Sequence, residues 1–336
     1  MYRKIFALTL LTVLLFGCAP AVTPQAAPTI GSTQPPQIQT GPAPSAVEGS
    51  PTAIATTTSA AITLTDGLGR TVTLNHPAQR IVSMAPSNTE ILFAIGAGSQ
   101  VVGRDDFSDY PVAVQSLPKV GGTDKYNNEQ IVALQPDLIL AAEINTADQV
   151  KALESLGLTV YYLKNPTTLE EMYGNLETVA KLTGHEADAD TLIASLKARV
   201  AAVDNKIATV TSHPSVFYEI DATDPAKPYT AGPGTFIDLL IQRAGGTNIA
   251  GTSKDQYPQL SLEQVVALNP SFILLGDALY GATPDVVKAR PGWGSLSAVK
   301  NGNVIAVDDN LFSRPGPRLV DGLELLAKIL HPELFQ

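Results

Sequence analysis

The feature that most constrains the fold is a segment that occurs twice. The sequence EQIVALQPDLIL starts at Glu129, and EQVVALNPSFIL starts at Glu263. In each copy an apolar turn and a polar residue are followed by a proline, Pro136 or Pro270, and then by a second apolar run. Proline breaks a helix and disfavours the helical conformation in the residue before it. Each copy therefore predicts a short helix that ends before the proline, followed by a short buried strand.

The repeat extends upstream of both segments. In the first half a short strand is followed by Ser87-x-x-Glu90, which predicts a capping box and a helix starting at Asn88. In the second half a strand and a loop are followed by Thr235-x-x-Asp238, which predicts the start of a matching helix. Each half thus alternates strand, helix, strand, helix, strand. This order predicts an α/β protein with two Rossmann-like lobes, each with a mainly parallel sheet.

One long helix is expected to join the lobes. The sequence from about 186 to 210 lacks Pro and Gly, and Leu192, Leu196 and Val200 recur at four-residue steps on one helical face. A helix of about 25 residues would be about 37 Å long. The expected boundaries are an N-terminal lobe over 61–183, a connecting helix over 184–210 and a C-terminal lobe over 211–336, with a ligand cleft between the lobes.

The first residues have the features of a targeting signal. Arg3 and Lys4 precede an apolar run that is too short to span a bilayer comfortably. The sequence LFGC that ends at Cys18 resembles the lipobox of bacterial lipoproteins. This resemblance implies that residues 1–17 are removed as a signal peptide and that Cys18 carries the lipid. The alternative is an ordinary secretory signal with an incidental cysteine, although Cys18 is the only cysteine of the chain.

Residues 18–60 are expected to form a disordered linker between the lipid and the folded body. They are rich in Pro, Ala, Thr, Ser and Gln, and Glu48 is their only charged residue. Such a composition cannot bury enough apolar surface to offset the entropy lost on ordering. The body is therefore expected to be extracytoplasmic and anchored to the cell membrane. The formal net charge of the whole chain is −10 at pH 7, without a basic run, which argues against nucleic acid as a partner.

Seven sequence segments, which follow one another through nearly all of the body, carry a family resemblance. They are PAQRIVSMAPSNTEILFAIG (77–96), FSDYP (107–111), NNEQIVALQPDLIL (127–140), GPGTFIDLLIQRAGGTNIA (232–250), YPQLSLEQVVALNPSFILL (257–275), PGWGSLSAVKNGNVIAVDD (291–309) and RPGPRLVDGLELLAKILHPE (314–333). Together they resemble the periplasmic substrate-binding proteins of ABC importers for cobalamin and ferric siderophores. These are the class III binding proteins, which have a helical backbone between the lobes.

The resemblance implies a role for the repeated glutamates. In this family one surface glutamate of each lobe docks onto arginines of the dimeric membrane permease, and the matching positions are Glu129 and Glu263. One carboxylate on each lobe suits a two-fold symmetric partner, and arginine–carboxylate pairs are directional. The alternative is that each acid only favours the positive end of its helix dipole.

The resemblance also places ligand-binding residues in the cleft, at the carboxyl ends of the strands. Two tryptophan positions of the family are occupied by Thr123 and Ala142, which weakens the resemblance to cobalamin binders. Trp293 is expected in the core. Residues at matching positions are Phe107, Tyr229, Tyr257 and Asn310; further candidates by loop position are Tyr110, Tyr126, Tyr218 and Phe312, and Arg314 could meet an anionic ligand.

Other functions find little support in the sequence. The four histidines are scattered and have no metal-ligand spacing, and neither a dinucleotide-binding motif nor a nucleophile motif is present. We therefore expect a monomeric binding protein that is not an enzyme and has no metal site or resident cofactor. Cobalamin, a ferric siderophore and haem stay open as the ligand. The alternative function is a cell-surface lipoprotein of the same fold that acts as a haem binder, sensor or enzyme.

Overall fold

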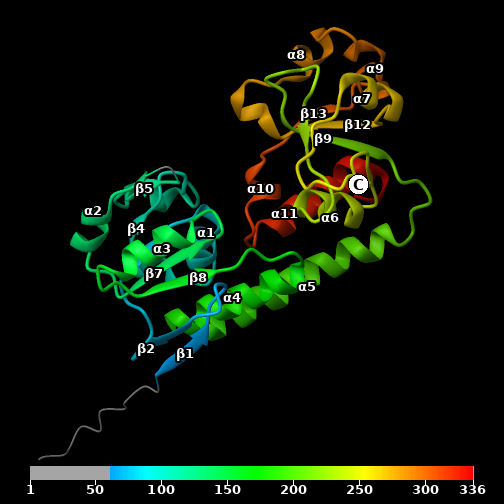
Figure 1. The fold of residues 1–336 in the computed structure, drawn as a ribbon. Coiled ribbons are helices and arrows are strands. Elements are labelled where there is room, and N and C mark those ends of the chain that lie inside the picture. The colour runs from blue at the N-terminus through cyan, green and yellow to red at the C-terminus, as the bar shows by residue number, and fades with distance from the viewer. Residues whose placement is uncertain (1–60, 124, 336) are drawn as a thin grey trace, which may run out of the picture. The chain divides into compact units, whose positions relative to one another are not determined.

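The computed structural model describes residues 61–123 and 125–335, which lie within one compact unit that spans Thr57–Gln336 (Figure 1). The expected signal peptide, Cys18 and the expected linker lie outside the described residues.

The N-terminal lobe is built on a parallel sheet with the strand order β4-β3-β7-β8. A hairpin, β1-β2, precedes this sheet, and a second small antiparallel pair, β5-β6, follows β4 in the chain. The elements in chain order are β1 (Ile62–Thr65), β2 (Thr71–Leu74), β3 (Ile81–Ser83), α1 (Pro86–Ala94), η1 (Ala97–Gln100), β4 (Val101–Arg104), η2 (Val112–Ser116), β5 (Gly121–Gly122), β6 (Lys125–Tyr126), α2 (Asn128–Ala133), β7 (Leu138–Ala142), α3 (Ala147–Glu154), β8 (Val160–Leu163) and α4 (Leu169–Thr183).

The C-terminal lobe follows the long helix α5 (Glu186–Ile207) and has the strand order β10-β9-β12-β13, with β11 also paired to β9. Only β10 in this sheet is antiparallel to its neighbour. The elements in chain order are β9 (Ser215–Asp221), β10 (Tyr229–Thr230), α6 (Phe236–Arg243), β11 (Thr247–Asn248), α7 (Leu262–Leu268), β12 (Phe272–Leu275), η3 (Gly276–Tyr280), α8 (Pro284–Ala289), η4 (Trp293–Ser295), α9 (Ser297–Lys300), β13 (Val304–Ala306), α10 (Asn310–Ser313), α11 (Leu319–Leu330) and η5 (Pro332–Leu334).

The two sheets share one topology. In the N-terminal lobe β3 lies between β4 and β7, and in the C-terminal lobe β9 lies between β11 and β12, with parallel pairing throughout. The chain passes through β3-α1-β4-α2-β7 in one lobe and β9-α6-β11-α7-β12 in the other. The predicted alternation and the predicted mainly parallel sheets are therefore confirmed.

The repeated segments have the same local structure. Their helices, α2 and α7, are capped by the side chains of Asn127 and Ser261, each of which accepts a hydrogen bond from a backbone N–H one turn on. Both helices end before the prolines, as predicted. The residues just before the prolines, Gln135 (φ 49°) and Asn269 (φ 40°), are the only non-glycine residues with positive φ in the described ranges. The two copies therefore share even the left-handed backbone conformation of the residue before the proline.

The two predicted helix starts in the upstream repeat have different outcomes. Thr235 caps α6, and its hydroxyl accepts a hydrogen bond from the backbone N–H of Asp238 at 3.2 Å. The capping box predicted at Ser87 and Glu90 is wrong, because α1 begins earlier, at Pro86, and its N-cap residue, Ala85, offers no side-chain cap. Proline suits the first helical position, where its missing N–H costs no hydrogen bond.

The long helix α5 lies along both lobes (Figure 1) and contacts α4 on one side and α11 on the other. Its buried residues, such as Leu196 and Val200, belong to a core that runs through both lobes. Alternate strand residues face opposite sides of each sheet. Ile81 of β3 and Val216 of β9 accordingly face this shared core, whereas α2 and α7 cover separate outer cores.

Candidate functional site

A cavity of about 500 Å³ lies where loops of both lobes meet. From the N-terminal lobe it is lined by Glu143 and Ile144, which follow β7, and by residues 164–167, which follow β8. The loops at the carboxyl ends of parallel strands are the usual ligand site of open α/β sheets. The C-terminal lobe contributes Ile220, Gly234, Thr235, Phe236, Ile237, Gln256, Tyr257, Asp309, Phe312, Ser313 and Pro315.

A second hollow of about 260 Å³ extends this cavity toward the N-terminus of α1. Its lining includes residues 85–87, Ala142 and Arg314, and it shares Ile144, Asn165, Ser313 and Pro315 with the larger cavity. The two hollows are therefore parts of one interlobe cleft. Alanine at position 142, where the family resemblance implies tryptophan, leaves space in this part of the cleft.

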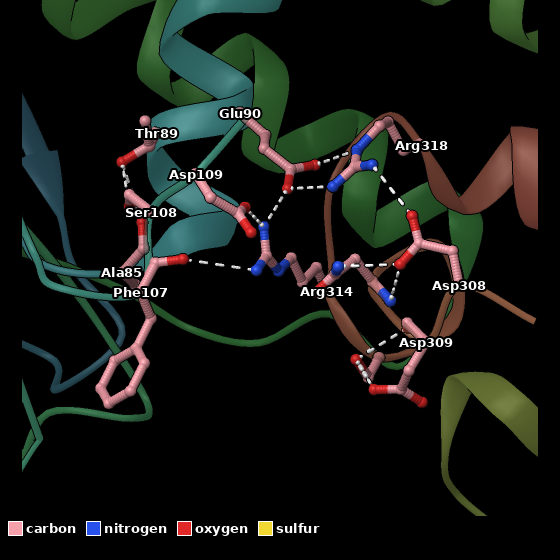
Figure 2. A network of polar contacts seen from close by, with 12 residues as sticks. Ala85, Thr89, Glu90, Phe107, Ser108, Asp109, Asp308, Asp309, Arg314 and Arg318 are labelled. Atoms are coloured by element: carbon pink, nitrogen blue, oxygen red, sulfur yellow. Dashed lines mark hydrogen bonds and ion pairs between the residues drawn. The ribbon is translucent and has the colours of Figure 1, made fainter. Parts of the chain in front are cut away.

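Only some of the predicted aromatic residues line the cleft. Tyr257 does so with 58% of its surface exposed, which leaves its ring available to a ligand. Phe107, Tyr110 and Tyr229 are also well exposed, but they lie outside the linings of both hollows. Figure 2 shows the ring of Phe107 directed away from the neighbouring polar network.

Two predicted aromatic residues are fully buried, which differs from the expected role in ligand contact. The rings of Tyr218 and Phe312 pack edge to face with their centroids 5.7 Å apart, and neither has exposed surface. The hydroxyl of Tyr218 donates to Oδ1 of Asp309 at 2.7 Å. The alternation of side chains along β9 directs Tyr218 into the shared core, so its position is explained by core contacts. Phe312 nevertheless contributes to the lining of the larger cavity.

Tyr126 and Asn310 also have structural partners. The hydroxyl of Tyr126 donates to the backbone carbonyl of Met84 at 3.1 Å and accepts from Nδ2 of Asn145 at 2.8 Å. Burial, reinforced by the negative charge of Asp105, raises the pKa of Tyr126 to about 12. Asn310 donates to Oδ1 of Asp308 at 2.8 Å and does not line either hollow. Both side chains therefore stabilise loops beside the cleft.

A charged network beside the cleft crosses from one lobe to the other (Figure 2). Glu90 of α1 is buried and accepts from Nε and Nη2 of Arg318 at 2.8 and 2.6 Å, and from Nη1 of Arg314 at 3.0 Å. Arg314 also donates to Oδ1 of Asp109 at 2.6 Å. The guanidinium of Arg318 lies over the ring of Tyr110, 4.1 Å from its centroid. Within the described ranges, all hydrogen bonds between the N-terminal lobe and the C-terminal lobe pass through these two arginines.

The network keeps both arginines charged. Burial by itself would lower the pKa of Arg314, but the hydrogen bonds to Asp109 and Glu90 outweigh it and the pKa is raised. The same balance, with Glu90 as the main partner, raises the pKa of Arg318. Arg314 was predicted as a contact for an anionic ligand. In the structure its guanidinium already donates to the carboxylates of Glu90 and Asp109.

The repeated glutamates, by contrast, face solvent. Glu129 and Glu263 occupy the second position of α2 and α7, and both are exposed. In Figure 1 both helices lie away from α5, at the outer part of their lobes. The structure therefore leaves both carboxylates accessible to a partner, although a dipole role would be equally compatible with this position.

Several cleft residues were missed by the sequence analysis, among them Glu143, Lys164 and Asp309. For the first two a signal existed, because each follows a predicted or recognisable apolar strand, where a parallel sheet collects its ligand contacts. Trp293, expected in the core, is fully buried there. Among residues 61–123 and 125–335, no group of His, Cys, Asp and Glu could hold a metal ion, and no helix is long and apolar enough to cross a membrane.

Comparisons with known proteins agree on the family. The sequence profile described as periplasmic binding protein matches residues 81–311. An uncharacterised ABC transporter substrate-binding lipoprotein of Bacillus subtilis is 35% identical over 280 residues, which cover 82% of this chain and 87% of the relative. A cobalamin-binding protein of Halobacterium salinarum is 32% identical, with coverage of 80% and 74%.

The fold agrees with solved structures of the same kind. A periplasmic heme-binding protein from Roseiflexus, solved in its apo form, has a TM-score of 0.69 and 28% identity, and the match covers 76% of this chain and 99% of that protein. Proteins of this family bind ligands and are not enzymes. The chain thus combines two parallel-sheet lobes and an interlobe cleft with matches to these relatives. It belongs to the periplasmic binding protein family, as an extracytoplasmic substrate-binding protein of an ABC importer.

Proposed function

We propose that this protein captures cobalamin or a related metal chelate in the interlobe cleft and delivers it to its permease. The observation that carries the proposal is the composite cleft, in which about 500 Å³ and a further 260 Å³ are lined by loops of both lobes. The exposed ring of Tyr257 offers a stacking surface for a flat macrocycle. Relatives named for cobalamin support this ligand.

Calorimetric titration of the purified protein with cyanocobalamin, haem and ferric siderophores tests the proposal. We expect submicromolar binding of cyanocobalamin with one ligand per chain, and a loss of about tenfold in affinity for Tyr257→Ala, since a buried stacking contact contributes roughly 1–1.5 kcal/mol. Tyr280→Ala is the matched control, because Tyr280 is 91% exposed and lines neither of the two hollows of the cleft. Failure to bind cyanocobalamin while another chelate binds would reassign the ligand.

We also propose that Glu129 and Glu263 dock onto the permease and that lipid on Cys18 holds the protein at the membrane, where it acts as a monomer. The support for docking is that both carboxylates are exposed at equivalent positions of a structural repeat. Metabolic labelling with a radioactive fatty acid tests the anchor. The wild-type protein should be labelled, and Cys18→Ser should lose both the label and membrane retention.

A further inference from the structure

The charged side chains that line the larger cavity carry an excess of negative charge. The larger cavity has two carboxylates, Glu143 and Asp309, and one ammonium group, Lys164. Asp309 accepts hydrogen bonds at both oxygens, from the hydroxyl of Tyr218 at 2.7 Å and from the hydroxyl of Ser313 at 2.6 Å. These two donors hold its carboxylate in place in the lining of the cavity.

The arginines nearest to the cleft do not reverse this charge. Arg314 lines the smaller hollow, but its guanidinium donates to Glu90, to Asp109 and to the backbone carbonyl of Phe107 at 3.4 Å. Arg318 is held by Glu90 and faces Asp308, with Nη1 and Oδ2 3.9 Å apart. The carboxylates of Glu90, Asp109 and Asp308 lie around the two guanidinium groups (Figure 2). The network as a whole thus adds further negative charge beside the cleft.

An anionic ligand that displaced Glu90 from Arg314 would leave Glu90 with Arg318 as its compensating charge. The side chain of Glu90 is 1% exposed, and its charge is compensated by these arginines alone among the described residues. The two arginines therefore connect the lobes, and their positive charge is already offset by the carboxylates of Glu90, Asp109 and Asp308.

We infer that the cleft selects metal chelates that carry no net negative charge, and that it excludes polyanionic ones. This inference rests on the proposed function, since it concerns the ligand of the same cleft. Neutral corrinoids and neutral or cationic ferric hydroxamates meet the requirement. Ferric tris-catecholates, with three negative charges, and haem, with two propionates, do not. The net charge of −10 of the whole chain adds to the exclusion by repelling anions as they approach.

The test compares four probes by isothermal titration calorimetry on the full-length lipidated protein in detergent. They are cyanocobalamin, which is neutral, ferrioxamine B, which has one positive charge, haem, and ferric enterobactin, which has three negative charges. We expect at least one of the first two to bind about a hundredfold more tightly than either anion. Tighter binding of ferric enterobactin or haem would overturn the inference and leave chelate binding intact. Binding of none of the four would overturn the proposed function, and the inference with it.

Two variants examine the assigned charges. Glu143→Gln removes a carboxylate from the cavity, and Asp109→Asn removes the negative charge from one partner of Arg314, at a side chain that is 59% exposed. Each should raise the affinity ratio of ferric enterobactin to cyanocobalamin by about tenfold at low salt, because three ligand charges feel the change. Asp285→Asn on α8 is the control with the same change of charge at an exposed site outside the cleft, and it should leave the ratio unaltered. An equal change of both affinities in the two cleft variants would indicate a structural effect and contradict the inference.

Discussion

Glu90 and Asp238 arise from the same sequence pattern in the two lobes but have different roles. Asp238 is the third residue of α6, and its carboxylate accepts from Gln242 and Asn248 of its own lobe, each at 2.8 Å. Glu90 is the fifth residue of α1, since that helix begins at Pro86, and its carboxylate binds two arginines of the other lobe. A shift of two positions in the helix start thus converts a local contact into the connection between the lobes.

The largest expected effect tests this difference directly. Glu90→Ala should lower the free energy of unfolding by about 3–5 kcal/mol, because Arg314 and Arg318 lose the buried partner between them. Asp238→Ala should cost about 1–3 kcal/mol, the effect of leaving buried donors without an acceptor. Urea unfolding followed by circular dichroism gives both values.

Hydrogen exchange should separate the two variants further. Glu90→Ala is expected to increase exchange at the start of α1 and around α10, on both sides of the lobe connection, whereas Asp238→Ala should affect only α6 and β11. If Glu90→Ala changed exchange in its own lobe alone, the assignment of Glu90 as an interlobe connection would be wrong. Asp190→Ala, at an exposed position of α5, is the control.

A second prediction concerns the parts of the lobes that are alike. Because α2 and α7 present Glu129 and Glu263 at the same helical position, Glu129→Arg and Glu263→Arg should each reduce ligand uptake by about tenfold or more. A charge-assisted contact to a cationic partner contributes roughly 1.5–3 kcal/mol. Uptake of labelled ligand by cells that carry each variant is the measurement.

Ligand affinity of the two docking variants should remain that of the wild type, since neither residue lines the cleft. Glu186→Arg, at the exposed first turn of α5, serves as the charge-matched control. Unimpaired uptake by the double variant would refute docking through these glutamates.

A third prediction separates the two left-handed residues that precede the prolines. Gln135→Gly should stabilise the protein by about 0.5 kcal/mol. Glycine has no steric cost at positive φ, and this gain exceeds the cost of its larger entropy in the unfolded chain. Asn269→Gly should instead destabilise it by about 1 kcal/mol. The side chain of Asn269 donates to Oγ of Ser297 and accepts from its N–H, both at 2.8 Å, and glycine loses both contacts. Thermal unfolding that showed the same sign for both variants would contradict this account.

The smallest expected effect is a pH dependence. The hydrogen bond to Arg199 lowers the pKa of Glu324, against the opposing effect of burial. This contribution to stability is fully present above the ordinary carboxyl value of 4.5 and is lost as the pH falls through the lowered value in the folded protein. Glu324→Gln should therefore weaken the acid sensitivity below about pH 4.5, by less than about 1 kcal/mol for this partly exposed pair.

Asp105 provides the opposite case. Burial raises its pKa above the ordinary value of 3.8, although hydrogen bonds from Ser108 and Phe107 oppose the shift. Its contribution is present below the unfolded value and is lost as the pH rises through the folded value. Asp105→Asn should therefore remove the loss of stability that the wild type shows as the pH rises above 3.8.

The Glu324 prediction has its own contrary outcome. If the free energies of unfolding of Glu324→Gln and of the wild type fell equally at acid pH, the Arg199 contact would not contribute to stability.

The cleft was only partly predictable from the sequence. Tyr257 and Arg314 were expected there and do line it, but Tyr218 was expected beside them and is buried in the core. Sequence position places a residue at the end of a strand, yet the pleat decides which of two neighbouring side chains faces the loops. Glu143 and Lys164 line the cavity, and their only local signal is that each directly follows an apolar strand.

The sequence by itself determined the repeat and hence the alternation of strands and helices in each lobe, because helix-ending prolines and apolar runs act within a few residues of themselves. It also predicted an acid in the first turn of α2 and of α7, and the family resemblance implied that both acids face solvent. Only the tertiary structure decided that Glu90 meets Arg314 and Arg318, more than two hundred residues away in the chain. That contact, and the charge of the cleft beside it, depend on how α1 and α10 approach one another, and no local pattern encodes such an approach.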